Sequence, residues 1–514
     1  MTDFNAARPP FYWGVSTSGY QSEGGYNQPG QPQNNWSQAE RSGQVAVTGK
    51  AAEFWQRYAK DFATCQHLGV TAFRMSLEWA RIQPASDPQI RTAPAFDFQA
   101  MDDYALRIAA CQKAGLEPIV TLQHFTHPLW LGVDAWLKEE TLGAYLTYVE
   151  TAVSHINHRL VTIHQTRPIR WFLTINEPNI LVINTYLNGT FPSDQGISLN
   201  RAMVAFDHLL AAHIQAYDRI HQIYATQGWD SPMVSLNTYC SDLYWSEKLV
   251  WDLLNLASQP VPAQQLPHYF RHRAESFETA LRQFNLPFRR DLPYRVGRLF
   301  RQIVHWMGER YLGPQSFQTT LRAVANCQGD RLFDYLALDY YDPFLAHSVR
   351  LPSFADLESD VPDFRGWVMS SMQTKWWDWR SLPEGLYCFC RYYSQEYSGT
   401  PILIAENGMA LRRTEDNKTA TTRRDQLRRS QFLREHLAQV QRLKTAGIPL
   451  VGYCHWSFTD NYEWGSFTPR FGLFSLDFER GCDRREADHL GDRPAQTYAQ
   501  LIAQYSPAPS LPQP

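Results

Sequence analysis

Polar and ionisable side chains close several short apolar runs of this sequence, and their types suit acid–base and nucleophilic chemistry. The run RWFLTINEPN ends in Asn176 and Glu177, and TPILIAENG ends in Glu406. AFRMSLEW carries Arg74 inside an apolar run, and EPIVTLQHF ends in Gln123 and His124. A buried, unpaired carboxylate is costly, so a glutamate at the end of a buried strand needs a partner or a chemical role.

Two facing carboxyl groups supply the chemistry of glycoside hydrolysis, in which one protonates the departing oxygen and the other attacks the anomeric carbon. The attacking group has to be ionised, which Arg74 and the hydroxyl of Tyr341 favour. The donor has to be protonated, and the negative charge of the attacker raises its pKa. For a single glutamate, a structural ion pair is the simpler interpretation; two glutamates on different strands favour catalysis.

These side chains need strands to position them, and eight short apolar runs alternate with segments of helical period. We expect strands at 12–17, 71–78, 117–124, 170–177, 233–239, 333–341, 401–406 and 450–457. The clearest helical segments are 51–68, 98–114, 141–161, 198–224, 424–446 and 493–505. Strands that are apolar throughout favour an α/β fold with a single (β/α)8 TIM barrel, with elaborated loops at the C-terminal face where reactive residues belong. An open doubly wound sheet is the alternative, but no GxGxxG follows a strand.

Composition limits the class of protein. A 44% hydrophobic fraction over 514 residues supports a large core, and a net charge of −3 gives no reason to expect nucleic acid as the partner. No apolar stretch approaches the roughly 18 residues of a membrane span. The first ten residues lack a signal-like apolar run, and the eight scattered cysteines have no metal-binding or CxxC spacing, so we expect reduced thiols and a cytoplasmic protein. The aromatic content of 14% suits flat, amphipathic ligands such as sugars.

One stretch interrupts the alternation. We expect residues 1–505 to form one catalytic barrel, with 240–332 as an atypical inserted loop and helical region over the barrel mouth and 506–514 as a loose C-terminal tail. The middle of the insertion, 268–310, carries nine arginines and no lysine against four acidic residues, with interleaved aromatics. Solvated or paired arginines on an elaborated loop are the simpler interpretation. The alternative interpretation is a surface that binds an anionic partner or makes peripheral contact with a membrane.

From about residue 11 to 505, the sequence resembles the family 1 retaining β-glycosidases. The segments that carry the resemblance are FYWGVSTSGYQSEG (11–24), FRMSLEWARIQP (73–84), TINEPN (174–179), LPEGL (382–386), IAENGM (404–409), WSFTDNYEW (456–464) and RFGL (470–473). The resemblance implies a single (β/α)8 barrel, with the acid/base after the fourth strand and the nucleophile after the seventh.

Carried over residue by residue, the resemblance makes Glu177 the acid/base and Glu406 the nucleophile, with Arg74 and Tyr341 supporting the nucleophile. The implied substrate contacts are Gln21, His124, Asn176 and Glu463 for the sugar hydroxyls, Trp456 and Trp464 for the apolar sugar face, and Trp379 for the aglycone. No metal or organic cofactor is implied.

The sequence departs from the family pattern at four places. The usual HWDLP segment reads HFTHP, so Phe125 replaces a tryptophan that lines the glycone site. Asp339 replaces the usual asparagine and adds a carboxyl group, which repels charge at Glu406 if ionised and mimics asparagine if protonated. The stretch between 464 and 470 is one residue shorter than is common, and 240–332 resembles the family poorly.

The leading hypothesis is a retaining β-glycosidase that hydrolyses terminal β-D-glucosides, β-D-galactosides or β-D-fucosides; the same polar groups hydrogen-bond each of these sugars. Glu463, in place of the family's phosphate-binding serine and lysine, argues against 6-phospho-sugars. A transglycosidase that passes the sugar to an alcohol, glycan or glycolipid is the alternative. A non-catalytic sugar-binding barrel is disfavoured because both glutamates are present. The sequence predicts no particular oligomeric state.

Overall fold

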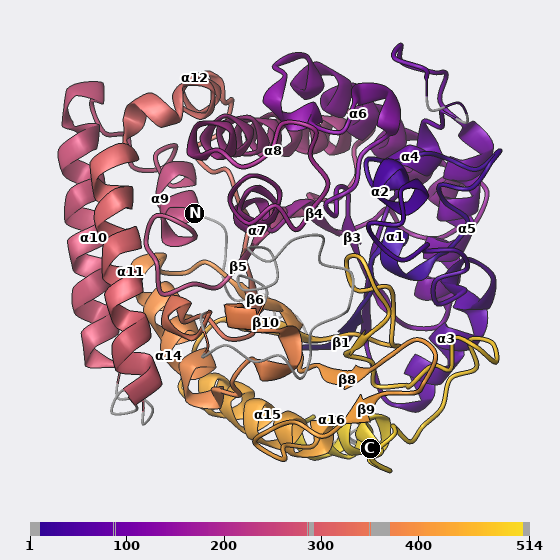
Figure 1. Cartoon of the computed structure of the whole chain (residues 1–514). Helices are drawn as coiled ribbons and strands as arrows, with labels where there is room; N and C mark the ends of the chain where they lie inside the picture. The colour runs from indigo at the N-terminus through magenta and orange to yellow at the C-terminus, as the bar shows by residue number, and fades with distance from the viewer. Residues whose placement is uncertain are drawn as a thin grey trace, which may run out of the picture.

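The barrel is the centre of the molecule, and helices form a ring around it (Figure 1). The computed structural model describes residues 11–85, 87, 89–284, 286, 292–348, 350 and 371–506. The expected tail at 506–514 lies outside the described residues except for Ser506. Among the described helices, none is both long and apolar enough to cross a membrane.

Eight parallel strands close the barrel in the order β1-β10-β7-β6-β5-β4-β3-β2. This confirms the predicted TIM barrel, and each strand lies on one of the eight predicted apolar runs. The strands are β1 (Tyr12–Ser16), β2 (Ala72–Ser76), β3 (Glu117–Thr121), β4 (Trp171–Asn176), β5 (Met233–Tyr239), β6 (Leu336–Tyr340), β7 (Ile402–Asn407) and β10 (Leu450–Trp456). A small sheet outside the barrel has the order β11-β8-β9, formed by β11 (Pro469–Arg470), β8 (Leu411–Arg413) and β9 (Ala420–Thr421).

The predicted helical segments correspond to α3, α5, α6, α8, α15 and α16. The α-helices are α1 (Gly19–Ser22), α2 (Ser37–Arg41), α3 (Phe54–His67), α4 (Trp79–Ile82), α5 (Phe98–Lys113), α6 (Glu140–Thr162), α7 (Pro178–Val182), α8 (Leu199–Gln227), α9 (Lys248–Leu254), α10 (Leu266–Gln283), α11 (Leu292–Tyr311), α12 (Gln318–Asn326), α14 (Pro383–Glu396), α15 (Arg429–Thr445) and α16 (Pro494–Tyr505).

The start of α15 differs from the predicted residue 424. Gln426 has φ of 55°, and the Asp425 carboxylate accepts a hydrogen bond from the Leu427 amide at 3.1 Å. Such a side-chain turn competes with helical backbone bonding, so the helix begins only at Arg429. The other end agrees with the prediction, because Gly447 leaves the helix at φ of 74°.

The inserted segment 240–332 contains α9, α10, α11 and α12. In Figure 1, α10 and α11 lie side by side at the left of the molecule, outside the ring of strands. Helix α11 packs against loops that follow β5 and β6: a Cβ added at Gly297 would meet the Ala346 oxygen at 2.0 Å, and one at Gly308 would meet Trp245 at 2.3 Å. The insertion therefore contacts the mouth side of the barrel, and its effect on the acceptor side stays a prediction.

Some of the arginines in the insertion are paired. Arg301 donates to Asp242 at 2.6 Å and to Glu278 at 2.6 Å, and Arg273 donates to Asp252 at 2.7 Å. These contacts tie α10 and α11 to the loop after β5 and to α9. Arg271 also faces Glu309 at 3.7 Å, so the simpler interpretation of the basic stretch, paired arginines, holds for at least these three.

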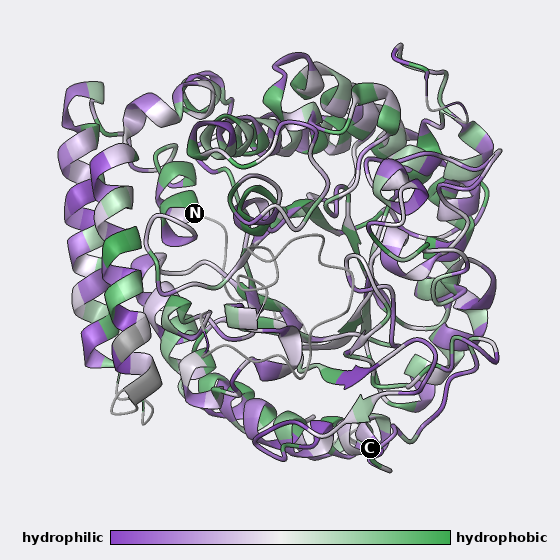
Figure 2. Ribbon diagram, viewed as in Figure 1, coloured by the Kyte–Doolittle hydropathy of each residue, from purple (hydrophilic) through white to green (hydrophobic). Residues whose placement is uncertain are grey.

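A buried apolar layer closes the barrel interior below the strand ends. Ala72, Ala337 and Cys454 belong to this layer, and each is at most 1% exposed. Side chains alternate along a strand, so residues two positions further on point into the same interior. That spacing puts Arg74, Asp339 and Trp456 in the next layer, toward the mouth. In Figure 2 the barrel strands are largely green, whereas the outer helices alternate green with purple.

Candidate active site

Glu406, at the end of β7, is buried and doubly hydrogen-bonded. Arg74 Nη1 of β2 donates to Glu406 Oε1 at 2.5 Å, and the Tyr341 hydroxyl donates to Oε2 at 2.8 Å. Burial raises the pKa of Glu406, while Arg74 and Tyr341 oppose that shift. Both contacts stabilise the carboxylate form, because hydrogen bonds and a nearby cation favour the charged state.

Glu177 follows β4 and stands directly before α7. Its backbone is left-handed, with φ of 35°. The backbone amide of Glu177 donates to the backbone carbonyl oxygen of Asn237 at 3.0 Å. Side-chain atom Oε1 is buried without a hydrogen-bond partner among the described residues. Burial, followed by the charges of Asp339 and Glu406, raises the pKa of Glu177 well above its ordinary value. Burial and the neighbouring carboxyl groups therefore favour the protonated form of Glu177.

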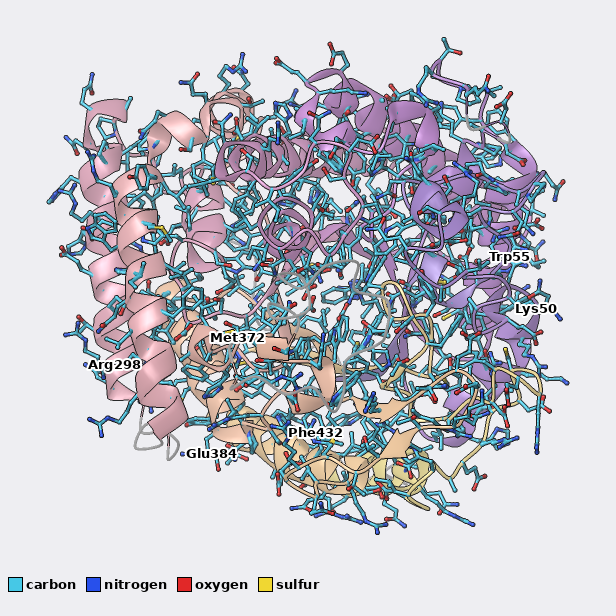
Figure 3. The ribbon with its side chains drawn as sticks, in the orientation of Figure 1. Lys50, Trp55, Arg298, Met372, Glu384 and Phe432 are labelled. Atoms are coloured by element: carbon cyan, nitrogen blue, oxygen red, sulfur yellow. The ribbon has the colours of Figure 1, made fainter. Side chains whose placement is uncertain are left out.

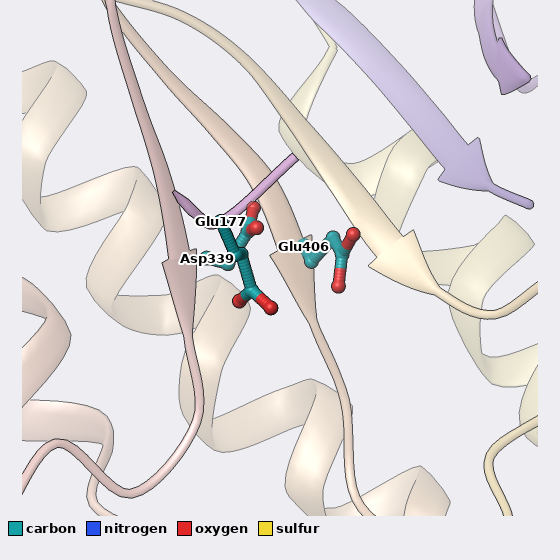
Figure 4. A group of neighbouring side chains, drawn as sticks. All are labelled: Glu177, Asp339 and Glu406. Atoms are coloured by element: carbon teal, nitrogen blue, oxygen red, sulfur yellow. The ribbon is translucent and has the colours of Figure 1, made fainter. Parts of the chain in front are cut away.

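A third carboxyl group, Asp339 of β6, completes a cluster with Glu177 and Glu406 (Figure 4). One oxygen from each of the three lies within 4.8 Å of the others. The strand register brings them together: Leu338 pairs with Ile404, but the next residue, Asp339, pairs with Glu406. This register shift skips Ala405 and turns both acidic side chains into the interior.

Amides connect this cluster across the strands. Arg74 Nη2 donates to Asn176 Oδ1 at 2.5 Å, and Asn237 Nδ2 donates to the same oxygen at 2.7 Å. Asn237 also donates to Asp339 Oδ2. The contacts hold Asn176 between Arg74 and Asn237, with its amide group available to a ligand.

Three buried carboxylates are also a donor set that divalent cations accept. Here the guanidinium of Arg74 already neutralises Glu406 at 2.5 Å, and a cation would have to compete with it. The arrangement therefore suits proton transfer and nucleophilic attack better than metal binding.

Gln21 and Glu463 form a second polar group, near Trp456. Gln21 Nε2 donates to Glu463 Oε2 at 3.3 Å and to Asn461 Oδ1 at 3.5 Å. Burial, with a smaller contribution from Glu406, raises the pKa of Glu463 to about 8, although hydrogen bonds from Trp456 and Gln21 oppose the shift. The structure thus brings these three predicted ligand contacts together.

Aromatic rings surround the polar groups on two sides. The His124 ring is nearly parallel to those of Trp456 and Trp464, with ring centroids 5.8 Å from each. Burial and the charge of Arg74 lower the pKa of His124 well below its ordinary value, which keeps the ring neutral. On the other side Trp379 contacts Tyr341, with centroids 5.3 Å apart.

Three residues of the site have a left-handed backbone. Phe125, Glu177 and Trp464 have φ of 67°, 35° and 42°, a region that non-glycine residues rarely adopt. Such conformations persist where the surroundings impose them, typically at functional sites. Phe125 contacts Trp464 at 4.9 Å between centroids, and its role in lining the glycone site stays a prediction.

Sequence reasoning missed two residues of the site. Asn237 bridges Asn176 and Asp339, and Tyr239 stacks on Tyr341 with centroids 5.9 Å apart. Both lie at the end of β5, in the run MVSLNTY. The sequence did contain a signal for Asn237: an amide side chain near the end of an apolar run, which is also how Asn176 was found.

Comparison with known proteins identifies the family of the chain. The profile of the family Glycosyl hydrolase family 1 matches residues 5–242 and 269–503. Beta-glucosidase A of Thermotoga maritima is 25% identical over 475 residues, covering 91% of this chain and 92% of the relative. The 6-phospho-beta-galactosidase 1 of Streptococcus pneumoniae is 24% identical over 496 residues, covering 91% and 93%.

Solved structures show the same fold. The AHE enzyme from Alicyclobacillus herbarius superposes with a TM-score of 0.65 at 22% identity, covering 98% of this chain and 99% of the other. The Thermotoga maritima beta-glucosidase in complex with castanospermine gives a TM-score of 0.64 at 21% identity, covering 98% and 100%. The profile match leaves out only 243–268 between its two parts, a stretch that contains α9. The chain belongs to glycosyl hydrolase family 1 and is a glycoside hydrolase.

Proposed function

We propose that the protein is a retaining β-glycosidase that hydrolyses terminal non-reducing β-D-glucosides, β-D-galactosides or β-D-fucosides. The observation that carries this proposal is the distance between carboxyl groups. Oxygens of Glu177 and Glu406 lie within 4.8 Å of each other. Retaining enzymes hold their two carboxyl groups about 5–5.5 Å apart, whereas inverting enzymes need about 6.5–9.5 Å to admit a water molecule.

In this mechanism Glu406 attacks the anomeric carbon while Glu177 protonates the departing oxygen. Arg74 and Tyr341 hold Glu406 ionised and oriented, through contacts at 2.5 and 2.8 Å. Esterification then removes the charge of Glu406, which lowers the pKa of Glu177 and lets it deprotonate water. Attack by that water releases the sugar with its original configuration.

The remaining predicted residues suit recognition of the sugar. Gln21, Glu463 and His124 offer polar atoms to the glycone hydroxyls, while Trp456 and Trp464 offer flat apolar surfaces. Asn176 hydrogen-bonds the 2-hydroxyl group of the sugar, and Trp379 provides an aromatic surface for the aglycone. A similar beta-glucosidase, from Thermotoga maritima, has been solved in complex with castanospermine and with deoxynojirimycin, which supports a sugar-like ligand for this site.

Unphosphorylated sugars fit this site better than the substrates named for the 6-phospho-beta-galactosidase relatives. Glu463 is 6% exposed and hydrogen-bonded by Gln21. A buried carboxyl group at that position repels a phosphate or must remain protonated, because two like charges in a buried site are costly. We also propose a cytoplasmic location, which the free thiols of all eight cysteines support.

Hydrolysis of a panel of aryl β-glycosides, followed by NMR of the anomer released first, tests the proposal. We expect the β-anomer to appear first with the glucoside, galactoside or fucoside, and slower or no reaction with the 6-phospho-glycosides. Release of the α-anomer would make the enzyme inverting and contradict the assignment of Glu406 as nucleophile. Added alcohol acceptors in the same assay separate hydrolysis from the transglycosidase alternative by the product formed.

A further inference from the structure

The carboxyl group of Asp339 is the feature that the proposed mechanism does not use. Asp339 is fully buried, with 0% of its surface exposed, and lies beside both Glu177 and Glu406. The inference drawn from it rests on the proposed function, because it concerns the acid/base step of that reaction.

Charge balance is the first observation. Arg74 contacts Glu406 at 2.5 Å and is the cation that faces the three carboxyl groups from the described part of the chain. One guanidinium balances one carboxylate. Two more carboxyl groups, within 4.8 Å in a buried site, cannot both ionise without a large electrostatic cost. At least one of Glu177 and Asp339 therefore carries a proton.

The buried oxygens that lack a hydrogen-bond partner indicate where that proton lies. Asp339 Oδ2 accepts from Asn237, but Asp339 Oδ1 and Glu177 Oε1 are both buried without a partner among the described residues. Two carboxylates only accept hydrogen bonds, so they cannot satisfy each other. A proton between the two groups satisfies one oxygen of each and removes the cost of leaving both unpaired.

The other groups that face Asp339 do not supply this proton. They are Arg74 from β2, Glu406 from β7, Cys240 after β5, Cys454 from β10 and Tyr341, whose hydroxyl donates to Glu406. Burial raises the pKa of both thiols, that of Cys454 to about 12, so the cysteines are neutral across the working range. Burial and the charge of Glu406 raise the pKa of Asp339 well above its ordinary value.

We propose that Glu177 and Asp339 form a proton-sharing carboxyl pair, in which Asp339 is a positioning residue that keeps the catalytic proton on Glu177 at alkaline pH. In the first half-reaction the proton passes from the pair to the glycosidic oxygen as its bond to C1 breaks and Glu406 bonds to C1. In the second, the pair accepts a proton from water as the water oxygen bonds to C1 and the ester bond breaks.

Asp339→Asn tests the pair, because asparagine retains the shape and the contact with Asn237 but cannot ionise. A neighbouring carboxylate raises the pKa of Glu177, so its removal lowers that pKa. The alkaline limb of kcat/KM against pH is expected to move to lower pH by about one unit. At pH values above the limb, kcat/KM is then about tenfold lower than in the unchanged protein. The acid limb, which reports Glu406, is expected to stay in place.

Asp334→Asn is the matched control. It lies just before the same strand, where its carboxylate accepts from Val234 and Tyr217, away from the site. Its alkaline limb is expected to match that of the unchanged protein. An alkaline limb that stays in place, or moves to higher pH, in Asp339→Asn would overturn the pair while leaving the glycosidase proposal intact.

A measurement without turnover separates the two proposals. Infrared titration is expected to show a protonated carboxyl band that persists into the alkaline range in the unchanged protein and disappears at lower pH in Glu177→Gln and in Asp339→Asn. A band that titrates identically in all three proteins would overturn the pair. Failure to hydrolyse any glycoside would contradict the proposed function, not the pair.

A different observation carries a second inference, which concerns the outer face of α11. Six large apolar side chains on this helix are exposed: Leu299 (63%), Phe300 (43%), Ile303 (56%), Trp306 (58%), Met307 (37%) and Tyr311 (57%). Leu299, Ile303 and Trp306 lie opposite the face where Gly297 and Gly308 pack on the barrel, and the other three lie beside them on the same flank of the helix. In Figure 2, α11 is green over part of its length although it lies at the outside of the molecule.

The charges beside this apolar face are basic. Arg295, Arg298 and Arg310 are exposed on α11 (Arg298 is labelled in Figure 3), and its acidic residue, Glu309, faces Arg271 at 3.7 Å. A second copy of the chain on this face would bring like charges together. An anionic bilayer accepts both the apolar side chains and the arginines.

We infer that the outer face of α11 binds the surface of anionic lipid bilayers, with the helix lying in the interface. The protein is expected to co-sediment with vesicles that contain phosphatidylglycerol, more weakly with pure phosphatidylcholine, and less at high salt. Ile303→Glu and Trp306→Glu are expected to reduce binding at least tenfold without changing hydrolysis of a soluble aryl glycoside.

Leu106→Glu is the control, since it introduces the same charge at an exposed leucine of α5. It is expected to bind like the unchanged protein. Absence of vesicle binding would overturn the inference, as would a dimer in solution that Trp306→Glu dissociates, because a second copy would then cover the face. Equal loss of binding in Leu106→Glu would also overturn it.

Discussion

Replacement of Glu406 by alanine is expected to lower kcat on aryl β-glycosides by about 10⁵-fold or more, which corresponds to about 7 kcal/mol of transition-state stabilisation. The change removes the atom proposed to bond to the anomeric carbon. It also leaves Arg74 without its carboxylate partner at 2.5 Å, so the positive charge faces the developing cation of the sugar. The measurement is kcat and KM on an aryl glycoside with a good leaving group.

A small nucleophile added from solution can replace the missing carboxylate. In Glu406→Ala, azide is expected to restore turnover and to give the α-glycosyl azide, because it attacks from the face that Glu406 occupied. Glu384→Ala is the matched control, since Glu384 is an exposed glutamate on α14, the helix before β7. Its activity is expected to be unchanged. A β-configured azide product, or no rescue in a folded variant, would remove Glu406 from the role of nucleophile.

Replacement of Glu177 by alanine is expected to have an effect that depends on the leaving group. Substrates with poor leaving groups need protonation in the first step and are expected to lose about 10³-fold or more in kcat/KM. Activated aryl glycosides leave without a proton, so their kcat/KM is expected to change little. The measurement is a series of aryl glycosides of increasing phenol pKa, compared in the unchanged and variant proteins.

The pH dependence of the same variant provides a second test. The raised pKa of Glu177 is expected to set the alkaline limb of kcat/KM, since activity requires its protonated form and is lost as pH rises through that pKa. That limb is expected to vanish in Glu177→Ala. Equal losses on good and poor leaving groups, with the limb retained, would assign the acid role to another residue.

The barrel was predictable because its strands are buried on both sides. Runs such as FLTIN and ILIAEN are apolar nearly throughout, and their acidic and amide side chains come where the strand reaches the mouth. Reading those ends found Glu177 and Glu406, and Arg74 was marked by its charge inside an apolar run. The structure brings these three residues into one cluster. The same reading missed Asn237, although its amide has the same position on β5 that Asn176 has on β4.

Helix ends were less predictable than helix bodies. Helix α15 begins five residues after the expected start, because Asp425 and Gln426 form a turn that its helical period does not reveal. The exposed apolar face of α11 was also beyond sequence reasoning. Its pattern is that of any amphipathic helix, and only the packing of Gly297 and Gly308 on the barrel shows that the apolar side faces outward.

Side-chain type and local order are enough to predict the eight strands, the residues at their ends and the family. How those strand ends face one another depends on the packing of the whole barrel. The shift that pairs Asp339 with Glu406, after Leu338 with Ile404, and the shift that pairs Asn176 with Asn237, after Leu173 with Ser235, are properties of two strands together. A register shift re-aims every side chain beyond it, so the separation of carboxyl groups that favours retention arises only when the barrel closes.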